Sequence, residues 1–245
     1  MMRPAHLRFA GAAQALGFLT LFGGAATPSP SALAWFPVVG AGMGLVLGGM
    51  WWLASQVWDP VVAAALVVAA DLALTGMLHL DGLVDSADGL LPPMARARRL
   101  EVMADPAAGA FGVGVAVTLL LLRWAALASL APSVPLLGAL WCASRLAMAG
   151  FTRSVPYARE SGLATAFRDA GRRTLPTAAS AVVLGAVLVA WGGVDAIAAV
   201  AVLGVTSAAV VGLSVRRLGG FTGDVLGAAA LAGETFGLLA AAAHR

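Results

Sequence analysis

The sequence predicts an all-α integral membrane protein, a polytopic helical bundle of about seven transmembrane helices with an N-terminal interfacial or re-entrant helix. Only 11% of its 245 residues are charged and its mean hydropathy is +0.91, whereas a soluble domain carries about 25% charged residues. So low a charge content could not cover a water-facing surface, and it excludes a disordered chain or a nucleic-acid-binding arm. A single cysteine, Cys142, excludes a disulfide scaffold.

Seven apolar runs are long enough to cross a membrane as helices, which takes about 20 residues for about 30 Å of hydrocarbon. They lie near residues 33–53, 60–80, 109–130, 135–151, 174–192, 194–214 and 223–243. A short turn at Gly193 separates the fifth run from the sixth. No linker or internal repeat divides the chain, so we expect one membrane-embedded domain over residues 1–245.

The apolar segment 9–22 is shorter and ends in paired glycines, so we expect an interfacial or re-entrant helix there. The alternative is a cleaved signal peptide. Arg3 and Arg8 precede this apolar run, and Ala25-Ala26 could follow a cleavage site.

The loops between the runs carry arginine asymmetrically. Twelve of the fifteen arginines fall in the N-terminal segment and in loops 81–108, 152–173 and 215–222, which share one side if the seven spans are right. The opposite side has only Arg245, and two more arginines lie within spans. Because cytoplasmic loops are enriched in basic residues, we expect the N-terminus and these three loops to face the cytoplasm, in a bacterial inner membrane.

Three of the twelve acidic residues, Asp81, Asp85 and Asp88, fall within eight positions at the end of the second run. A continuing helix would gather them into one stripe of about 60°. Their mutual repulsion requires a counter-ion, and hard carboxylate oxygens suit Mg²⁺. The stripe therefore predicts a magnesium site. The alternative is a solvated loop whose acids merely balance the basic residues around them.

Arginines follow this acidic stripe closely, at Arg96, Arg98 and Arg99. Guanidinium groups bind phosphate oxygens through paired hydrogen bonds, and a divalent metal bridges others. The combination predicts metal–phosphate chemistry on a diphosphate. Arg145 lies in the cytoplasmic half of its span, where it reaches either the headgroup zone or the active site, and we favour the site.

A second acidic motif, Gly219-Gly220-Phe221-Thr222-Gly223-Asp224, precedes the last span. Its glycines lead into a helix whose N-terminal amides suit an anion. The compatible alternative is that Asp224 is a helix N-cap or first-turn acid.

Polar residues within the predicted spans are expected to face the bundle interior and to be paired. Asp71 and Glu234 are each expected to have a buried partner or to be protonated, and Arg123 is one possible partner of Asp71. Arg123 lies near the end of its span, where snorkelling also explains it. His79 stands about 160° from Asp81 around a helix, so we expect it to support the metal ligands rather than to bind metal itself.

The run His79-Leu80-Asp81-Gly82-Leu83-Val84-Asp85-Ser86-Ala87-Asp88-Gly89 closely resembles the signature of the cobalamin synthase family, the adenosylcobinamide-GDP ribazoletransferases. The resemblance covers roughly residues 16–240. It continues in order through residues 99–105, 109–112, 144–145, 156–159 with Gly162, and 220–224 with Gly227. The chain departs from the family pattern at Leu21, where the family often has arginine, and at Pro106-Ala107-Ala108.

This resemblance implies a Mg²⁺-dependent membrane transferase that joins adenosylcobinamide-GDP to α-ribazole, or to its 5′-phosphate, and releases GMP in the assembly of the cobalamin nucleotide loop. It implies metal binding by Asp81, Asp85, Asp88 and Asp224, and a general base at Asp88 or Asp105. The substrate contacts that it implies are Arg96, Arg98, Arg99, Arg145, Arg159, Tyr157 and Gly223. Membrane lipid is the other expected partner and nucleic acid is not one. A homo-oligomer or an association with other cobalamin-assembly enzymes stays open.

Other classes of protein remain as alternatives. A CDP-alcohol phosphotransferase would show an Asp-Gly-x₂-Ala-Arg spacing, and a membrane prenyltransferase site usually begins with Asn-Asp, whereas this chain has no Asn. A transporter would place its key acids near mid-membrane, often with internal symmetry. A purely structural subunit would leave the acidic stripe unexplained.

Overall fold

The computed structural model of the 245-residue chain describes residues 5–23, 29–159 and 175–243. These residues form α-helices and short 3-10 helices and contain no β-strand beyond one isolated bridge, Tyr157 with Phe221. The elements are α1 (Ala5–Leu19), η1 (Leu21–Gly23), η2 (Ala32–Trp35), α2 (Phe36–Ala54), α3 (Pro60–Leu74), α4 (Leu78–Leu90), α5 (Arg96–Val102), α6 (Ala110–Ser129), α7 (Val134–Ser154), α8 (Leu175–Leu218) and α9 (Gly223–Ala242). The all-α prediction is confirmed.

Among the described residues, five helices are long and apolar enough to cross a membrane, or six if one bent pair counts as a single span. The five are Ala32–Ala54, Ala110–Ser129, Val134–Ser154, Ala179–Leu218 and Gly223–Ala242. A polytopic membrane protein is thus confirmed, with fewer separate helices than the seven apolar runs. The short α1 agrees with a segment that does not span. Several residues singled out in the sequence lie outside the described residues. They are Arg3, the Ala25-Ala26 pair of the alternative cleavage site, Gly162, Arg168, Arg172 and Arg173.

The predicted span 60–80 is corrected by the structure. Instead of one helix there are two, α3 and α4, which meet at 87°. The chain turns at Gly76 and Met77, whose φ angles of 58° and 60° are left-handed and incompatible with a continuing α-helix. As a result the three aspartates of the acidic stripe lie on a separate short helix, α4, rather than at the mouth of a straight span.

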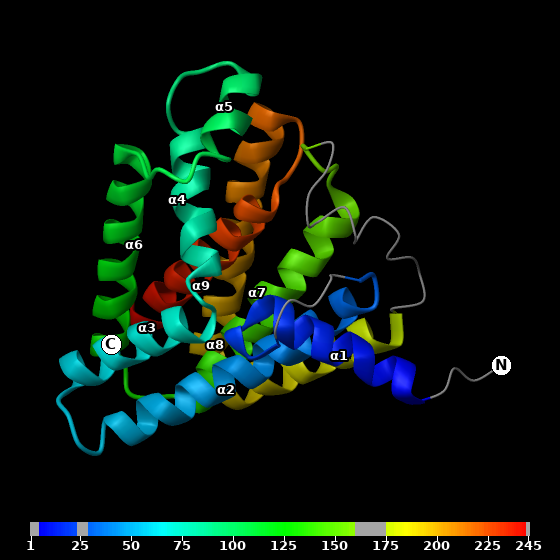
Figure 1. Cartoon of the computed structure of the whole chain (residues 1–245). Coiled ribbons are helices and arrows are strands. Elements are labelled where there is room, and N and C mark those ends of the chain that lie inside the picture. Colours follow the sequence, from blue (N-terminus) through cyan, green and yellow to red (C-terminus); the bar gives the residue numbers. More distant parts are fainter. Residues whose placement is uncertain (1–4, 24–28, 160–174, 244–245) are drawn as a thin grey trace.

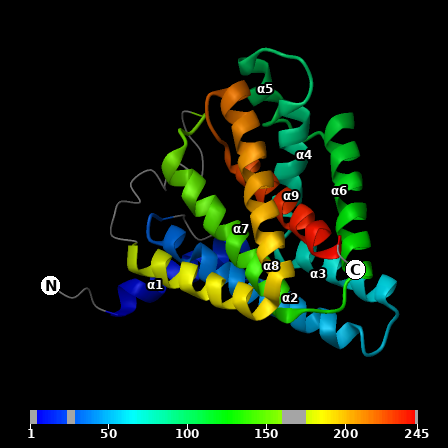
Figure 2. The ribbon, with the colours of Figure 1, turned by 180° about the vertical axis from the view of Figure 1, so that it is seen from behind.

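The predicted turn at Gly193 is confirmed, although the two runs beside it form the single long element α8. Gly193 has non-helical angles, φ 73° and ψ −161°, and kinks the helix there. The apolar part of α8 has 40 residues, about twice the length that a membrane span needs. Figure 2 shows that the first part of α8 lies along α2 at the base of the molecule, whereas the second part rises beside α9.

The helices pack closely where small residues face a neighbour. Gly40, Gly44 and Gly48 of α2 line up against α7, and a Cβ added to Gly44 would lie 2.2 Å from the Leu137 carbonyl oxygen. Spacing of small residues by four is typical of membrane helices whose backbones touch. Helix α9 occupies the centre of the bundle, in contact with α4, α6, α7 and α8 (Figure 1).

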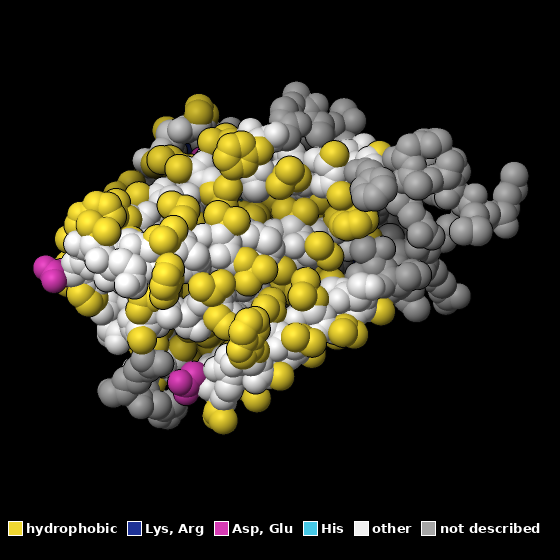
Figure 3. All heavy atoms as spheres, turned by 90° about the horizontal axis from the view of Figure 1, so that it is seen from below, with side chains coloured by type: hydrophobic (Ala, Val, Ile, Leu, Met, Phe, Trp, Pro, Cys, Tyr) yellow, Lys and Arg dark blue, Asp and Glu magenta, His cyan; other side chains and the backbone are white. Residues whose placement is uncertain are grey.

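The outer surface is apolar over wide areas. Seen from below, hydrophobic side chains are spread over the described part of this face, where two acidic groups are visible near the edges (Figure 3). Large exposed hydrophobic side chains on α2, α6 and α8 include Trp52, Val117, Val183 and Trp191. Such a surface is suited to contact with lipid.

Candidate active site

Three carboxylates line one pocket of about 290 Å³ between α4 and the segment that joins α5 to α6. Asp81 and Asp85 come from α4, one helical turn apart, and Asp105 comes from the joining segment, beside Met103 and Pro106. Residues four apart share one face of a helix, which explains why the first two acids of the stripe face the same pocket. The structure thus brings two acids of the stripe together with an acid more than fifteen residues further along the chain.

Asp88, the third acid of the stripe, is engaged elsewhere. Its side chain is buried, 8% exposed, and its two oxygens accept hydrogen bonds from the amides of Gly109 and Gly112 at 2.6 and 2.9 Å. Helix α6 begins here, and its N-cap residue, Gly109, has no side chain to cap it. Asp88 therefore caps α6 from a neighbouring helix, satisfying amides that lack an intrahelical partner.

The position of Asp88 argues against its two predicted roles, metal ligand and general base, because the side chain is buried against the start of α6 and is not among the residues that line the pocket. The contact also explains two glycines of the family-like pattern. A Cβ on Gly109 or Gly112 would lie 2.5 or 2.4 Å from a carboxylate oxygen of Asp88. The pair of glycines at the start of the third apolar run is the only sequence signal for this arrangement.

Asp105 is exposed and lines the pocket, as a residue that touches substrate should. Its Oδ1 accepts a 2.9 Å hydrogen bond from the amide of Ala107, which fixes the carboxylate in a tight turn. The turn is anchored on one side by buried Met103 and on the other by the Asp88–Gly109 contact. The hydrogen bonds from Gly109 and Gly112 to Asp88 thus help to place Asp105 opposite α4.

Asp224 lies in the first turn of α9, next to this group. A Cβ on Gly82 would lie 2.7 Å from the Asp224 carbonyl oxygen, so α4 and α9 touch here. Asp85 interacts electrostatically with Asp81, Asp224 and Asp88. The N-cap of α9 is Thr222, not Asp224, since the Thr222 hydroxyl accepts the Val225 amide. The structure thus brings the four acids of the two sequence motifs into one region.

Arg159 is the predicted arginine that reaches this region. Its Nη2 donates to Oδ2 of Asp224 and to the carbonyl oxygen of Met103, both at 3.1 Å. Tyr157 and Phe221 hold it there through the isolated bridge, in which the Ala158 amide donates to the Phe221 carbonyl at 2.8 Å. Tyr157 thus joins two loops, and Gly223 is exposed beside Asp224.

The other arginines expected at the phosphates have different partners. Arg96 donates to the carbonyls of Leu218 and Ala158, and Arg99, which is buried, donates to those of Gly89 and Leu90. Arg98 forms an exposed ion pair with Glu101 on the same helix. Arg96 and Arg99 therefore hold loops and helix ends together, which the positive charge of these loops does not reveal.

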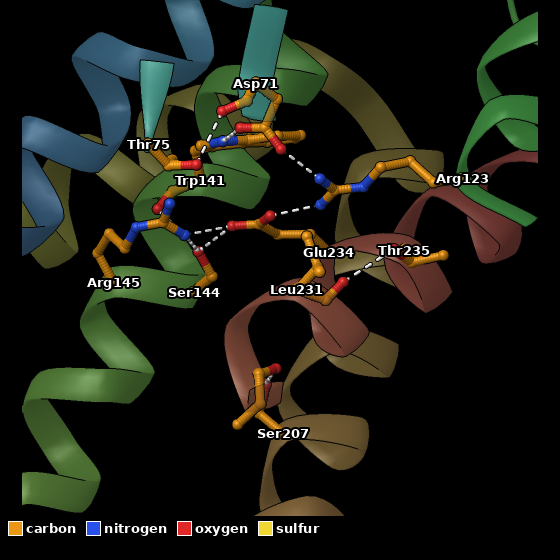
Figure 4. Close-up of polar contacts among 11 residues, drawn as sticks. Asp71, Thr75, Arg123, Trp141, Ser144, Arg145, Ser207, Leu231, Glu234 and Thr235 are labelled. Atoms are coloured by element: carbon orange, nitrogen blue, oxygen red, sulfur yellow. Dashed lines mark hydrogen bonds and ion pairs between the residues drawn. The ribbon is translucent and has the colours of Figure 1, made fainter. Parts of the chain in front are cut away.

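Arg145 does not line the pocket. It is 1% exposed and pairs with Glu234, which also pairs with Arg123, and Arg123 in turn pairs with Asp71 (Figure 4). The ring nitrogen of Trp141 and the hydroxyl of Ser144 complete this network. The predicted Asp71–Arg123 pair is confirmed. Snorkelling of Arg123 is wrong, because its side chain is buried among these partners and stacks on Trp141 at 5.1 Å.

His79 is buried against α9, away from the pocket, with its Nε2 atom lacking a hydrogen-bond partner. Among the residues that the structure describes, no group of three or more His, Cys, Asp or Glu side chains is arranged to hold a metal ion. The side-chain oxygen atoms that line the pocket are all carboxylate oxygens, from Asp81, Asp85 and Asp105, and these are the ligands that Mg²⁺ prefers. The donor set therefore fits the expected ion.

Fold and site together define a polytopic helical membrane protein with an acidic pocket. The sequence matches the model of the cobalamin-5-phosphate synthase family over residues 11–242. It is 37% identical over 241 residues to an adenosylcobinamide-GDP ribazoletransferase of Chlorobium phaeovibrioides, covering 94% of this chain and 96% of that protein. A protein of the same name from Pseudomonas savastanoi is 40% identical over 204 residues, covering 80% and 81%. No solved structure shows a significant match.

This chain belongs to the cobalamin-5-phosphate synthase family. It is accordingly a membrane enzyme of cobalamin biosynthesis and a transferase. The membership decides against a transporter and against a purely structural subunit.

Proposed function

We propose that this enzyme transfers the adenosylcobinamide-phosphate group of adenosylcobinamide-GDP to a ribose hydroxyl of α-ribazole, or of its 5′-phosphate, with release of GMP. The relatives' names supply the donor substrate. The observation that carries the proposal is the pocket in which Asp81 and Asp85 face Asp105. An all-carboxylate pocket suits a diphosphate only if a divalent cation comes with it, since the negative charges otherwise repel.

Mg²⁺ is the proposed ion, held by Asp81 and Asp85, with Asp224 completing the site. When bound, it would neutralise the diphosphate and stabilise the charge that develops on GMP. Asp88 is not assigned to this set, because its oxygens cap α6.

The reaction is an in-line displacement at the phosphorus next to cobinamide. The ribazole hydroxyl oxygen forms the new P–O bond, and the bond to GMP breaks, with GMP keeping the electron pair. Asp105 accepts the hydroxyl proton, because it is the exposed carboxylate that faces the pocket from outside α4. Arg159, which donates a hydrogen bond to the carbonyl oxygen of the pocket residue Met103, binds a non-bridging phosphate oxygen.

We propose a bacterial inner membrane location with the pocket facing the cytoplasm. Supporting this, Arg99 and Arg217 bond carbonyls of residues 89–91 at the C-terminal end of α4, the helix that carries Asp81 and Asp85. Arg96 bonds the carbonyls of residues 158 and 218 in the neighbouring segments. Positive charge on one side of the bundle is typical of the cytoplasmic face.

The test is GMP release by the purified protein in nanodiscs, given adenosylcobinamide-GDP and α-ribazole, with Mg²⁺ or with EDTA. We expect Mg²⁺-dependent GMP and a cobalamin product, both lost in a folded Asp85→Asn variant. Full activity in Asp85→Asn would refute the metal site. Absence of product from the folded parent protein under any divalent metal would refute the reaction.

A further inference from the structure

Arg159 bridges the two halves of the candidate site. A single guanidinium nitrogen, Nη2, donates both to Asp224 on α9 and to the carbonyl of Met103 on the pocket wall, each at 3.1 Å. The Thr222 hydroxyl donates a second hydrogen bond to the same Oδ2 atom of Asp224, at 3.2 Å. One oxygen of Asp224, the proposed metal ligand from α9, is therefore shared between an arginine and a hydroxyl.

This ion pair is accessible, unlike the network around Glu234. The side chains of Arg159 and Asp224 are 28% and 25% exposed, whereas those of Arg145 and Glu234 are 1% and 2% exposed. A partly solvated ion pair contributes little net stability. It can therefore be exchanged for a stronger partner without unfolding the bundle.

A phosphate is that stronger partner for the guanidinium. Arginine binds phosphate oxygens through two parallel hydrogen bonds, whereas here it offers one nitrogen to one carboxylate oxygen. Without the ion pair to Arg159, the negative charge of Asp224 would no longer be neutralised. It would then add to the charges of Asp81 and Asp85, with which Asp224 already interacts electrostatically.

We infer that Arg159 exchanges its partner when substrate binds. Without substrate its guanidinium pairs with Asp224; when the diphosphate binds the guanidinium instead, Asp224 is released and becomes a ligand of the metal. Magnesium loading is thereby coupled to arrival of the diphosphate substrate. The inference rests on the proposed function and assigns Arg159 a positioning role toward Asp224 in addition to its phosphate contact.

The test measures binding of Mn²⁺ alone, by electron paramagnetic resonance, to the full-length protein in nanodiscs without substrate. Arg159→Gln is expected to bind Mn²⁺ about three- to fivefold more tightly than the parent, because the competing cation is gone. Arg159→Lys keeps the charge and should stay near the parent. Arg216→Gln removes an equal charge from an exposed position at the end of α8 and should also leave Mn²⁺ affinity unchanged.

Asp224→Asn completes the cycle. In the parent background we expect little change in substrate-free Mn²⁺ affinity, because Asp224 is occupied, and in Arg159→Gln it should abolish the gain. The inference is overturned if Arg159→Gln shows no gain, if the gain survives Asp224→Asn, or if Asp224→Asn alone weakens Mn²⁺ binding strongly. These results do not depend on turnover. If the parent protein makes cobalamin product but Arg159→Gln binds Mn²⁺ no more tightly than the parent, the exchange is refuted and the proposed reaction stays intact.

Discussion

Asp88 on α4 and Gly109 at the start of α6 are joined by a 2.6 Å hydrogen bond from the Gly109 amide to the Asp88 carboxylate. With the second bond, from Gly112, this contact fixes the position at which the chain enters α6. The segment just before it carries Asp105 into the pocket. Asp88 thus positions the segment that carries Asp105, opposite the two acids, Asp81 and Asp85, that line the pocket from α4.

The first prediction separates Asp88 from the metal ligands. Asp88→Asn replaces one acceptor oxygen by a donor that faces one of the two amides, and only the other hydrogen bond survives. The unfolding free energy should therefore fall by about 1–3 kcal/mol. Asp85→Asn should instead keep stability and lose at least about tenfold in Mn²⁺ affinity. Thermal unfolding and Mn²⁺ titration of both variants check this. Equal loss of Mn²⁺ affinity with unchanged stability in Asp88→Asn would make Asp88 a ligand after all.

The second prediction tests the glycine beneath that carboxylate. In Gly112→Ala the new Cβ would lie 2.4 Å from an Asp88 oxygen, whereas a Cβ on Gly114, in the same helix, meets nothing within 4 Å. Gly112→Ala should lower the unfolding free energy by about 1–3 kcal/mol. Gly114→Ala should be neutral or raise it by up to about 1 kcal/mol, since alanine favours a helix. Thermal unfolding of the pair decides, and equal stability of the two variants would contradict a steric clash with the Asp88 carboxylate.

The acidic pocket could be predicted from sequence because it depends on local spacing. Asp81 and Asp85 lie four residues apart, and any helix places them on one face. The role of Asp88 depends on which helix packs against α4, and no periodicity reports that. The bend at Gly76 is hidden for a similar reason, since a lone glycine in an apolar run is compatible with a straight span.

The buried ion-pair network shows the same limit. Charge complementarity alone suggests Arg123 as the partner of Asp71, and the structure confirms it. The pairing of Arg145 with Glu234 depends on how α7 and α9 are rotated about their axes. Hydropathy locates a span along the chain but does not report its rotation, so sequence alone could not separate Arg145 from the active site.

The third prediction concerns this network. Glu234→Gln leaves Arg123 paired with Asp71 alone and removes the acidic partner with which Arg145 pairs. It should lower the unfolding free energy by about 3–5 kcal/mol. Asp59→Asn, an exposed acid before α3, is the control and should change stability little. Thermal unfolding and yield of folded protein measure both effects.

The same variant tests whether the network touches substrate. Because Arg145 is buried and does not line the pocket, the folded fraction of Glu234→Gln should keep the parent KM for adenosylcobinamide-GDP. A raised KM with undiminished stability would return Arg145 to the substrate site.

The fourth prediction concerns Asp105 as the proton acceptor. Asp105→Asn retains an oxygen that can accept the Ala107 amide, so the turn should keep its shape while the base is lost. General-base catalysis contributes about 10²- to 10⁴-fold, and kcat should fall within that range with KM for α-ribazole nearly unchanged. Steady-state GMP release measures both constants, and Glu101→Gln, on the exposed side of α5, is the matched control. If Asp105→Asn raised KM and left kcat intact, Asp105 would bind substrate without accepting its proton.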